Sequence, residues 1–212
     1  MKKLISLAVA SALTCGIALA KEVKIGAVMP MSGPLAAYGQ VTYLGLELAN
    51  KLQPTLANGD TVKIVLVDNK GDKVETATAT TRLISSDKVT AILGALTSTN
   101  TAQTIAIADK KKVPVIASVA TNDKLTAKRE YANRVCFTDS FQGEVVANYA
   151  KEQGYKTAVV IVDQAQVYSL GLAKAFQNAF KKNGGKLLKK IMVTSGDKDF
   201  KAVVSQVKSL NP

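Results

Sequence analysis

The sequence predicts an α/β protein of two doubly wound lobes, each built on a parallel sheet, with the second lobe incomplete. Short runs rich in valine and isoleucine alternate with longer helical patterns from about residue 22 to the end. The runs are apolar throughout rather than alternating with polar residues, which is typical of strands buried on both faces of a sheet. Alternation of strand and helix therefore favours parallel strands joined by covering helices.

Strands and helices are expected to follow one another in strict order. The strands are predicted from β-branched runs at residues 23–29, 61–67, 89–93, 113–118, 134–137, 156–162 and 186–193. The helices are predicted from apolar residues at helical spacing in residues 36–51, 74–86, 98–111, 142–153, 170–182 and 199–210. We expect one lobe at 21–137, a second at 138–212, and a hinge near 134–141.

The last predicted helix has a complete apolar face and no strand after it. This face holds Phe200, Val203, Val204, Val207 and Leu210, and the following Asn-Pro pair has the composition of a turn. A lobe with only two strands buries its helices poorly. We therefore expect a sequence that is truncated roughly halfway through its second lobe.

Residues 1–20 have the pattern of a cleaved export signal. Lys2 and Lys3 precede an apolar stretch, 4–19, that ends in a small-x-small cleavage pattern before Lys21. The stretch is shorter than the roughly twenty residues that a spanning helix needs. Lipidation is the less favoured alternative because Cys15 lacks a small residue before it. The sequence predicts release into the periplasm.

The composition argues against most classes of secreted enzyme. The chain has no histidine, which removes the commonest zinc ligand and the usual general base of serine hydrolases. No nucleophile elbow, dinucleotide fingerprint or Walker loop occurs in the sequence. The net charge of +12 comes from scattered lysines without an aromatic-rich basic stripe, so nucleic acid is not an expected partner. No metal or cofactor is expected.

The remaining reactive side chains have structural interpretations. Asp68, Asp72, Asp139 and Asp163 lie on different loops near strand ends, where capping or hinge roles are favoured over a metal cluster. Cys136 lies in the apolar run 134–137 and is interpreted as an inert core thiol in a short buried strand.

Candidate binding residues follow the predicted strands. In open parallel sheets, ligands bind beyond the carboxyl ends of the strands, near helix N-termini. Ser98, at a helix start, can cap that helix and leave backbone N–H groups aimed at an anion such as a carboxylate. Thr121, on the neighbouring loop, could add a hydroxyl at the same point. The alternative is that both residues only cap helices, and that Tyr38 is a surface or core aromatic.

Sequence motifs along the chain resemble one protein family. They are strand 23–29, Met31-Ser-Gly-Pro-x-Ala-x-Tyr38-Gly39, Gly45-x-Glu-Leu-Ala49, Asp68-Asn69, Ile92-Leu-Gly94, Ser98-x-x-Thr101, Val113-Pro-Val-Ile116, Phe137-Thr-Asp-x-Phe-Gln-Gly143, Gly171-Leu-Ala173 and Lys198-Asp-Phe200. Together they resemble the periplasmic branched-chain amino-acid binding proteins, which are type I solute receptors of ABC importers. The resemblance spans essentially the whole chain after residue 20.

The resemblance implies a periplasmic receptor that closes on a small amino acid between two lobes. Ser98 and Thr121 would hold the ligand's carboxylate and ammonium, and Val119 would contribute its backbone. Tyr38 would flank the side-chain pocket, and Tyr168 would close over it from the second lobe. In such receptors, the acidic group that pairs with the ammonium is expected beyond residue 212.

The resemblance also implies partners and leaves an alternative open. The receptor would act as a monomer, without a cofactor, and deliver a branched-chain amino acid to an ABC permease in the inner membrane. The alternative is a sensory module that binds amides or other small polar solutes and signals through a membrane receptor. A secreted enzyme on a similar scaffold is the least favoured reading.

Overall fold

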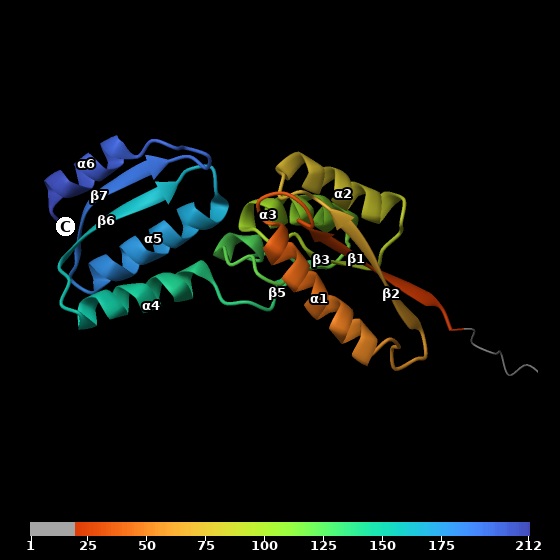
Figure 1. Ribbon diagram of the computed structural model, residues 1–212. Helices are drawn as coiled ribbons and strands as arrows, with labels where there is room; N and C mark the ends of the chain where they lie inside the picture. Colours follow the sequence, from red (N-terminus) through yellow and green to blue (C-terminus); the bar gives the residue numbers. More distant parts are fainter. Residues whose placement is uncertain (1–19) are drawn as a thin grey trace, which may run out of the picture.

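The structure is a computed structural model, and it describes residues 20–212 (Figure 1). The predicted export signal therefore lies almost entirely outside the described residues. Among the helices of the described part, none combines the length and the apolar character needed to cross a membrane.

Strands and helices alternate through the described residues, as the sequence predicts. The strands are β1 (Glu22–Met29), β2 (Thr61–Asp68), β3 (Ala91–Gly94), β4 (Val115–Ala117), β5 (Ala132–Arg134), β6 (Thr157–Asp163) and β7 (Lys186–Val193). The α-helices are α1 (Ala36–Leu52), α2 (Lys73–Ser85), α3 (Ser98–Ala108), α4 (Asp139–Glu152), α5 (Val167–Lys182) and α6 (Lys201–Leu210). Short 3-10 helices occupy Asp109–Lys111 (η1) and Asp123–Leu125 (η2).

The first lobe is a five-stranded parallel sheet with helices on both faces. Its strand order is β2-β1-β3-β4-β5, and the parallel register pairs Ile25 of β1 with Ile64 of β2 and Ala91 of β3. Ile25 faces α1, whereas the neighbouring Gly26 lies against Leu83 of α2, so α1 and α2 cover opposite faces. The main buried cluster lies between the sheet and the α2–α3 layer.

The second lobe has a two-stranded parallel sheet, β6-β7, accompanied by α4, α5 and α6. It lies beside the first lobe, and the chain passes between them from β5 to α4 (Figure 1). Its buried cluster is formed by Ala147, Ala150 and Phe180, where α4 and α5 pack against each other. The α/β architecture with a smaller second sheet confirms the predicted fold class, whereas the predicted lobe boundary stays a prediction.

The predicted strand at 134–137 is wrong. Strand β5 begins earlier, because Val115 of β4 pairs with Ala132, and the pairing ends at Arg134. Val135 is 77% exposed and Phe137 is 56% exposed, so this apolar run is the connection to α4 rather than a strand. Cys136 is only partly buried and is not a core thiol. Two residues of this run, Cys136 and Phe137, line a cavity between the lobes.

Candidate functional site

A cavity of about 600 Å³ lies between the lobes, at the carboxyl ends of the first-lobe strands. The loops after β1, β3, β4 and β5 and the first turns of α1, α3, α4 and α5 contribute its lining. The lining residues are Leu35, Tyr38, Leu96, Thr97, Ser98, Ser118, Val119, Thr121, Cys136, Phe137, Gln142, Gln166 and Tyr168. All five binding residues proposed from the sequence are among them, although their roles in binding stay predictions.

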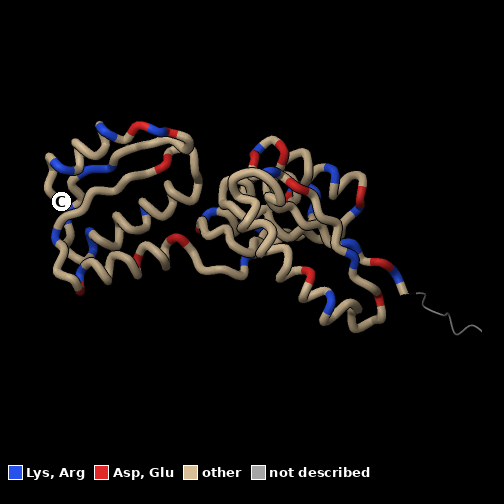
Figure 2. The backbone as a smooth tube through the Cα atoms, in the orientation of Figure 1, with Lys and Arg blue, Asp and Glu red and all other residues tan. Residues whose placement is uncertain are grey.

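The cavity has no formally charged side chain in its lining, within the described residues. The positions of lysine and arginine are instead distributed along the backbone of both lobes (Figure 2). A charged ligand would therefore have to be held by hydroxyl groups, amide groups and backbone dipoles. Such groups bind ions effectively where water is excluded, and helix N-termini favour anions.

We call the side of the cavity formed by Ser98 and Thr121 its floor. The start of α3 provides hydrogen-bond donors there. Thr97, with extended backbone angles, is the N-cap, and its hydroxyl accepts a hydrogen bond from the Asn100 N–H at 3.2 Å. The expectation that Ser98 caps the helix is therefore wrong, because Ser98 is already the first helical residue. Backbone N–H groups in a first helical turn have no acceptor in their own helix. The N–H groups of Ser98 and Thr99 are therefore left without an acceptor in α3.

Gly94 allows this loop to approach the adjacent strand. Its φ of +127° lies in a region that favours glycine, and a Cβ there would collide with the carbonyl oxygen of Val28. The close approach places the β3–α3 loop beside the end of β1, at the floor of the cavity.

Thr121 lies on the loop after β4 and is nearly buried, with 7% of its surface exposed. Its hydroxyl donates to Oδ1 of Asp139 at 2.7 Å, and the Asn122 side-chain amide donates to Oδ2 at 3.1 Å. Asp139 is fully buried as the first residue of α4. Burial raises the pKa of its carboxyl, and the hydrogen bond from Thr121 acts in the opposite direction.

The walls of the cavity are largely apolar and aromatic. Tyr38 is 68% exposed, Val119 is 47% exposed and Tyr168 is 39% exposed, and each contributes to the lining. Tyr168 is fixed by Gln142, whose Nε2 donates to the tyrosine hydroxyl at 3.2 Å. Large apolar side chains at the mouth of a cavity are available to contact an apolar ligand group.

The two lobes contact each other beside the cavity, at the N-termini of α3 and α5. The Thr99 hydroxyl donates to the side-chain oxygen of Gln166 at 3.0 Å and accepts from the Val167 N–H at 3.1 Å. The Asn122 side-chain amide also donates to the Val167 carbonyl oxygen at 3.1 Å. These bonds set how α5, and with it Tyr168, approaches the first lobe.

Sequence reasoning missed several residues of the lining. Leu35 and Leu96 lie on loops that were already candidate binding loops, so their position alone could have identified them. Gln142 and Gln166 belong to the second lobe, where no residue pattern distinguishes them from surface glutamines. Phe137 was assigned to a buried strand, and the misplaced strand concealed its role.

The predicted aspartate roles divide between caps and loop contacts. Asp72 caps α2 by accepting from the Val74 and Glu75 N–H groups at 2.7 and 2.9 Å. Asp68 accepts from the Met31 N–H at 2.8 Å, and it joins the loop after β1 to the end of β2.

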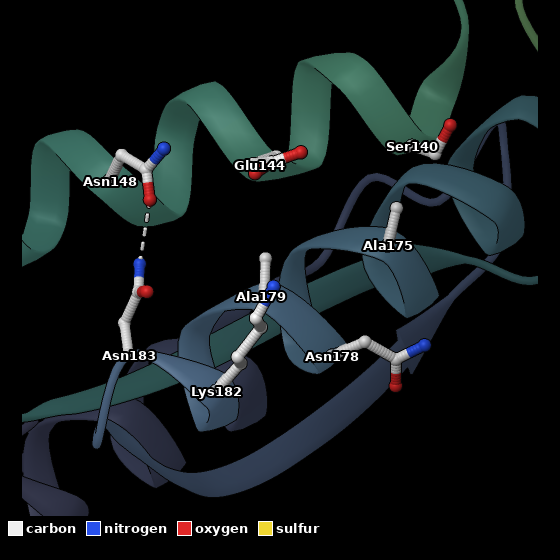
Figure 3. Close-up of a pocket in the computed structure, with 8 residues that line it drawn as sticks. All are labelled: Ser140, Glu144, Asn148, Ala175, Asn178, Ala179, Lys182 and Asn183. Carbon is white, nitrogen blue, oxygen red and sulfur yellow. Dashed lines mark hydrogen bonds between the residues drawn. The ribbon is translucent and has the colours of Figure 1, made fainter.

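A second, smaller cavity of about 260 Å³ lies between α4 and α5 (Figure 3). Its lining includes Glu144 and Lys182, and Asn183 donates to the side-chain oxygen of Asn148 at 2.9 Å. This cavity draws all its residues from the second lobe and lies away from the strand ends of the first. The inter-lobe cavity is therefore the better candidate site.

The chain matches the sequence profile of the periplasmic binding protein family over residues 22–212. It belongs to this family. The Leu/Ile/Val-binding protein of Escherichia coli (strain K12) is 31% identical over 198 residues, which cover 92% of this chain and 54% of that protein. The Leu/Ile/Val-binding protein homolog 3 of Brucella melitensis is 31% identical, with 98% of this chain and 57% of that protein covered. The chain thus spans about half the length of the curated relatives it matches.

Solved periplasmic binding proteins share the fold. A leucine binding protein from Thermotoga maritima superposes with a TM-score of 0.86 at 39% identity, covering 90% of this chain and 54% of that one. A branched-chain amino acid binding protein from Streptococcus pneumoniae, in complex with isoleucine, gives 0.78 at 36% identity, covering 89% and 54%. A solute binding protein from R. palustris, in complex with benzoate, gives 0.81 at 25% identity, covering 90% and 53%. These matches confirm the family resemblance found in the sequence motifs.

Proposed function

We propose that this periplasmic binding protein captures a small amino acid with an apolar side chain, most favourably a branched-chain one, and delivers it to an ABC permease. It would act in the periplasm, as a monomer and without a cofactor. The observation that carries the proposal is the inter-lobe cavity: residues of both lobes line it, with hydrogen-bonding groups on its floor and apolar side chains on its walls. The relatives that bind leucine, isoleucine and valine support the same ligand class.

The floor and the walls would hold different parts of the ligand. The carboxylate would lie against the N-terminus of α3, where the Ser98 hydroxyl and first-turn N–H groups face it. The ammonium would lie near Thr121 and the Val119 backbone. The aliphatic side chain would contact Tyr38 and be covered by Tyr168 from the second lobe.

Ligand binding to the folded chain should raise its thermal stability, because binding to the native state shifts the unfolding equilibrium. The test is a thermal-shift series with leucine, isoleucine, valine, threonine, acetamide and benzoate, followed by calorimetry. A rise in Tm with the branched-chain amino acids alone supports the proposal. No shift with any of these ligands at millimolar concentration contradicts it.

A double variant tests the assignment of the floor. Ser98→Ala with Thr121→Ala should weaken leucine binding by about 2–4 kcal/mol, because each charge-assisted hydrogen bond is worth about 1.5–3 kcal/mol. The matched control is Ser205→Ala on α6, an exposed hydroxyl far from the cavity lining. Unchanged leucine affinity in the double variant would mean that these hydroxyls have only structural roles.

An aromatic carboxylate is a second candidate ligand. Tyr38, Phe137 and Tyr168 all line the cavity, and aromatic walls suit a planar ring. The R. palustris relative was solved with benzoate. A larger Tm shift with benzoate than with leucine would favour this ligand class over the amino acids.

A further inference from the structure

The two floor hydroxyls of the cavity differ in the hydrogen bonds that they already make. Thr121 donates its hydroxyl proton to Asp139, at 2.7 Å. Ser98 instead accepts, from the backbone N–H of Asn122 at 3.3 Å, and its own proton has no protein acceptor within the described residues. A hydroxyl has one proton and two lone pairs, so a bond of one type leaves the other type free. Ser98 retains its proton for donation together with one lone pair, whereas Thr121 retains only acceptor capacity.

The groups around Asp139 are placed to donate to an ionised carboxylate. Thr121 donates to one carboxyl oxygen and the Asn122 amide donates to the other, at 2.7 and 3.1 Å. An ionised carboxylate can only accept, so with Asp139 ionised the Thr121 hydroxyl and the Asn122 amide are both donors at these positions. The Asp139 N–H also donates to the Thr121 carbonyl oxygen at 2.9 Å, so the two residues are joined in both directions.

Asn122 connects the two hydroxyls to the contact between the lobes. Its backbone N–H reaches Ser98, while its side-chain amide donates to Asp139 and to the carbonyl oxygen of Val167 at the start of α5. Asn122 and Asp139 are both buried. Neither side chain belongs to the cavity lining, so each acts on a ligand only through the lining residues that it contacts or positions.

We propose that Asp139 is a positioning residue that fixes the Thr121 hydroxyl as a hydrogen-bond acceptor towards the cavity, while the Asn122 N–H occupies one lone pair of Ser98 and leaves its proton free to donate. The inference rests on the proposed function and deepens it. A donor at Ser98 suits a ligand carboxylate, and an acceptor at Thr121 suits an ammonium. The floor therefore selects α-amino acids over carboxylic acids of the same shape that lack the amino group, including the aromatic acids.

Leucine and 4-methylpentanoate form a matched pair of probes for this inference, since they share the carboxylate and the side chain and differ in the ammonium. The side chain of Asp139→Asn carries an NH2 group in place of one carboxylate oxygen. In one orientation this NH2 group faces the Thr121 hydroxyl, and in the other it faces the Asn122 amide. We expect leucine affinity, measured by calorimetry on the whole chain, to fall about tenfold or more. The affinity for 4-methylpentanoate should change less than about twofold. Asp72→Asn, which makes the same substitution at the exposed N-cap of α2, should leave both affinities unchanged.

A double-variant cycle separates positioning from a general structural effect. If Asp139 acts through the Thr121 hydroxyl, Asp139→Asn should have little further effect on leucine binding in a Thr121→Val chain, because coupled residues are not additive. Equal weakening of both probes by Asp139→Asn, or full additivity in the cycle, overturns the inference and leaves the proposed function intact. A wild-type chain that binds neither probe overturns the proposed function and, with it, this inference.

A pH series on the unaltered chain tests the inference without a substitution, should Asp139→Asn not fold. Asp139 faces the Asp123 carboxylate of η2, the Arg134 guanidinium at the end of β5 and the Cys136 thiol. Protonation would give the Asp139 carboxyl a donor of its own and release the Thr121 hydroxyl. Leucine affinity should then fall on acidification while the Asp139 carboxyl titrates, as followed by carbon NMR. Constant leucine affinity through that titration overturns the inference.

Discussion

The two lobes are built from the same alternation of strand and helix but differ in how much apolar surface they bury. In the first lobe, five strands and two layers of helices enclose a continuous cluster that includes Leu83, Ile92 and Ile105. The second lobe has only two strands, and its buried cluster lies at the contact between α4 and α5. No residue of α6 is buried. The comparison indicates that the number of strands limits how much apolar surface a lobe can bury.

The largest expected effect comes from core truncation in each lobe. Leu83→Ala, at a position with no exposed surface, should lower the free energy of unfolding by about 2–5 kcal/mol. Phe180→Ala, in the second lobe, should cost about 3 kcal/mol, the lower end of the range for phenylalanine, because its looser surroundings can relax. Amide exchange should accelerate mainly in the substituted lobe. Acceleration of both lobes by either substitution would show that they share one cooperative unit.

A glycine substitution at the contact between the lobes should have the next largest effect. A Cβ on Gly171 of α5 would collide with the side chains of Asn122 and Asp139. Gly171→Ala should therefore cost about 1–3 kcal/mol, as measured by urea denaturation. Gly45→Ala is the matched helical control, since a Cβ there meets open space and alanine favours the helix by up to about 1 kcal/mol. Equal effects of the two substitutions would contradict the tight contact at Gly171.

Asp139 of α4 and Asp72 at the N-cap of α2 should also differ in the sign of their contribution to the pH dependence of stability. Burial raises the pKa of Asp139, so the folded state holds this proton more tightly than the unfolded state does. Its contribution to stability is present at low pH and is lost as the pH rises through the raised folded-state pKa, by at most about 1.4 kcal/mol per pH unit. Backbone N–H groups of Glu75 and Val74 lower the pKa of Asp72, whose contribution is lost as the pH falls.

Urea denaturation at a series of pH values measures both contributions. Asp139→Asn should weaken the fall in stability with rising pH. Asp72→Ala should weaken the opposite trend, to which Asp60, Asp68 and Asp163 also contribute through their lowered pKa values. An unchanged pH profile in Asp139→Asn would show that the folded and unfolded states bind this proton equally.

The smallest expected effects come from helix caps in the two lobes. Asp72→Ala at α2 and Thr138→Ala at α4 should each cost about 1 kcal/mol, because each side chain accepts from first-turn N–H groups. Amide exchange should increase in the first turn of the affected helix. Exchange that spreads from α4 into α3 would indicate that the cap also supports the contact between the lobes.

Much of the fold and part of the site could be predicted from the sequence. Strand positions were nearly correct where a long apolar run pairs on both sides, as in β1. The prediction of a strand failed at 134–137, where Cys136 and Phe137 line the cavity instead of pairing in the sheet. The loops that carry Ser98 and Thr121 were identified because parallel strands end at one edge of the sheet.

The amino-acid sequence by itself determined the order of elements, the family and the loops that form the cavity, since periodicity and local turn residues depend on neighbours in the chain. Only the tertiary structure decided which hydroxyl donates and which accepts. Asp139 and Thr121 are 18 residues apart, and Asn122 and Val167 are 45 residues apart. Such partners meet because β4, α4 and α5 converge at one end of the sheet, and hydrogen-bond geometry between distant residues leaves no periodic pattern in a sequence.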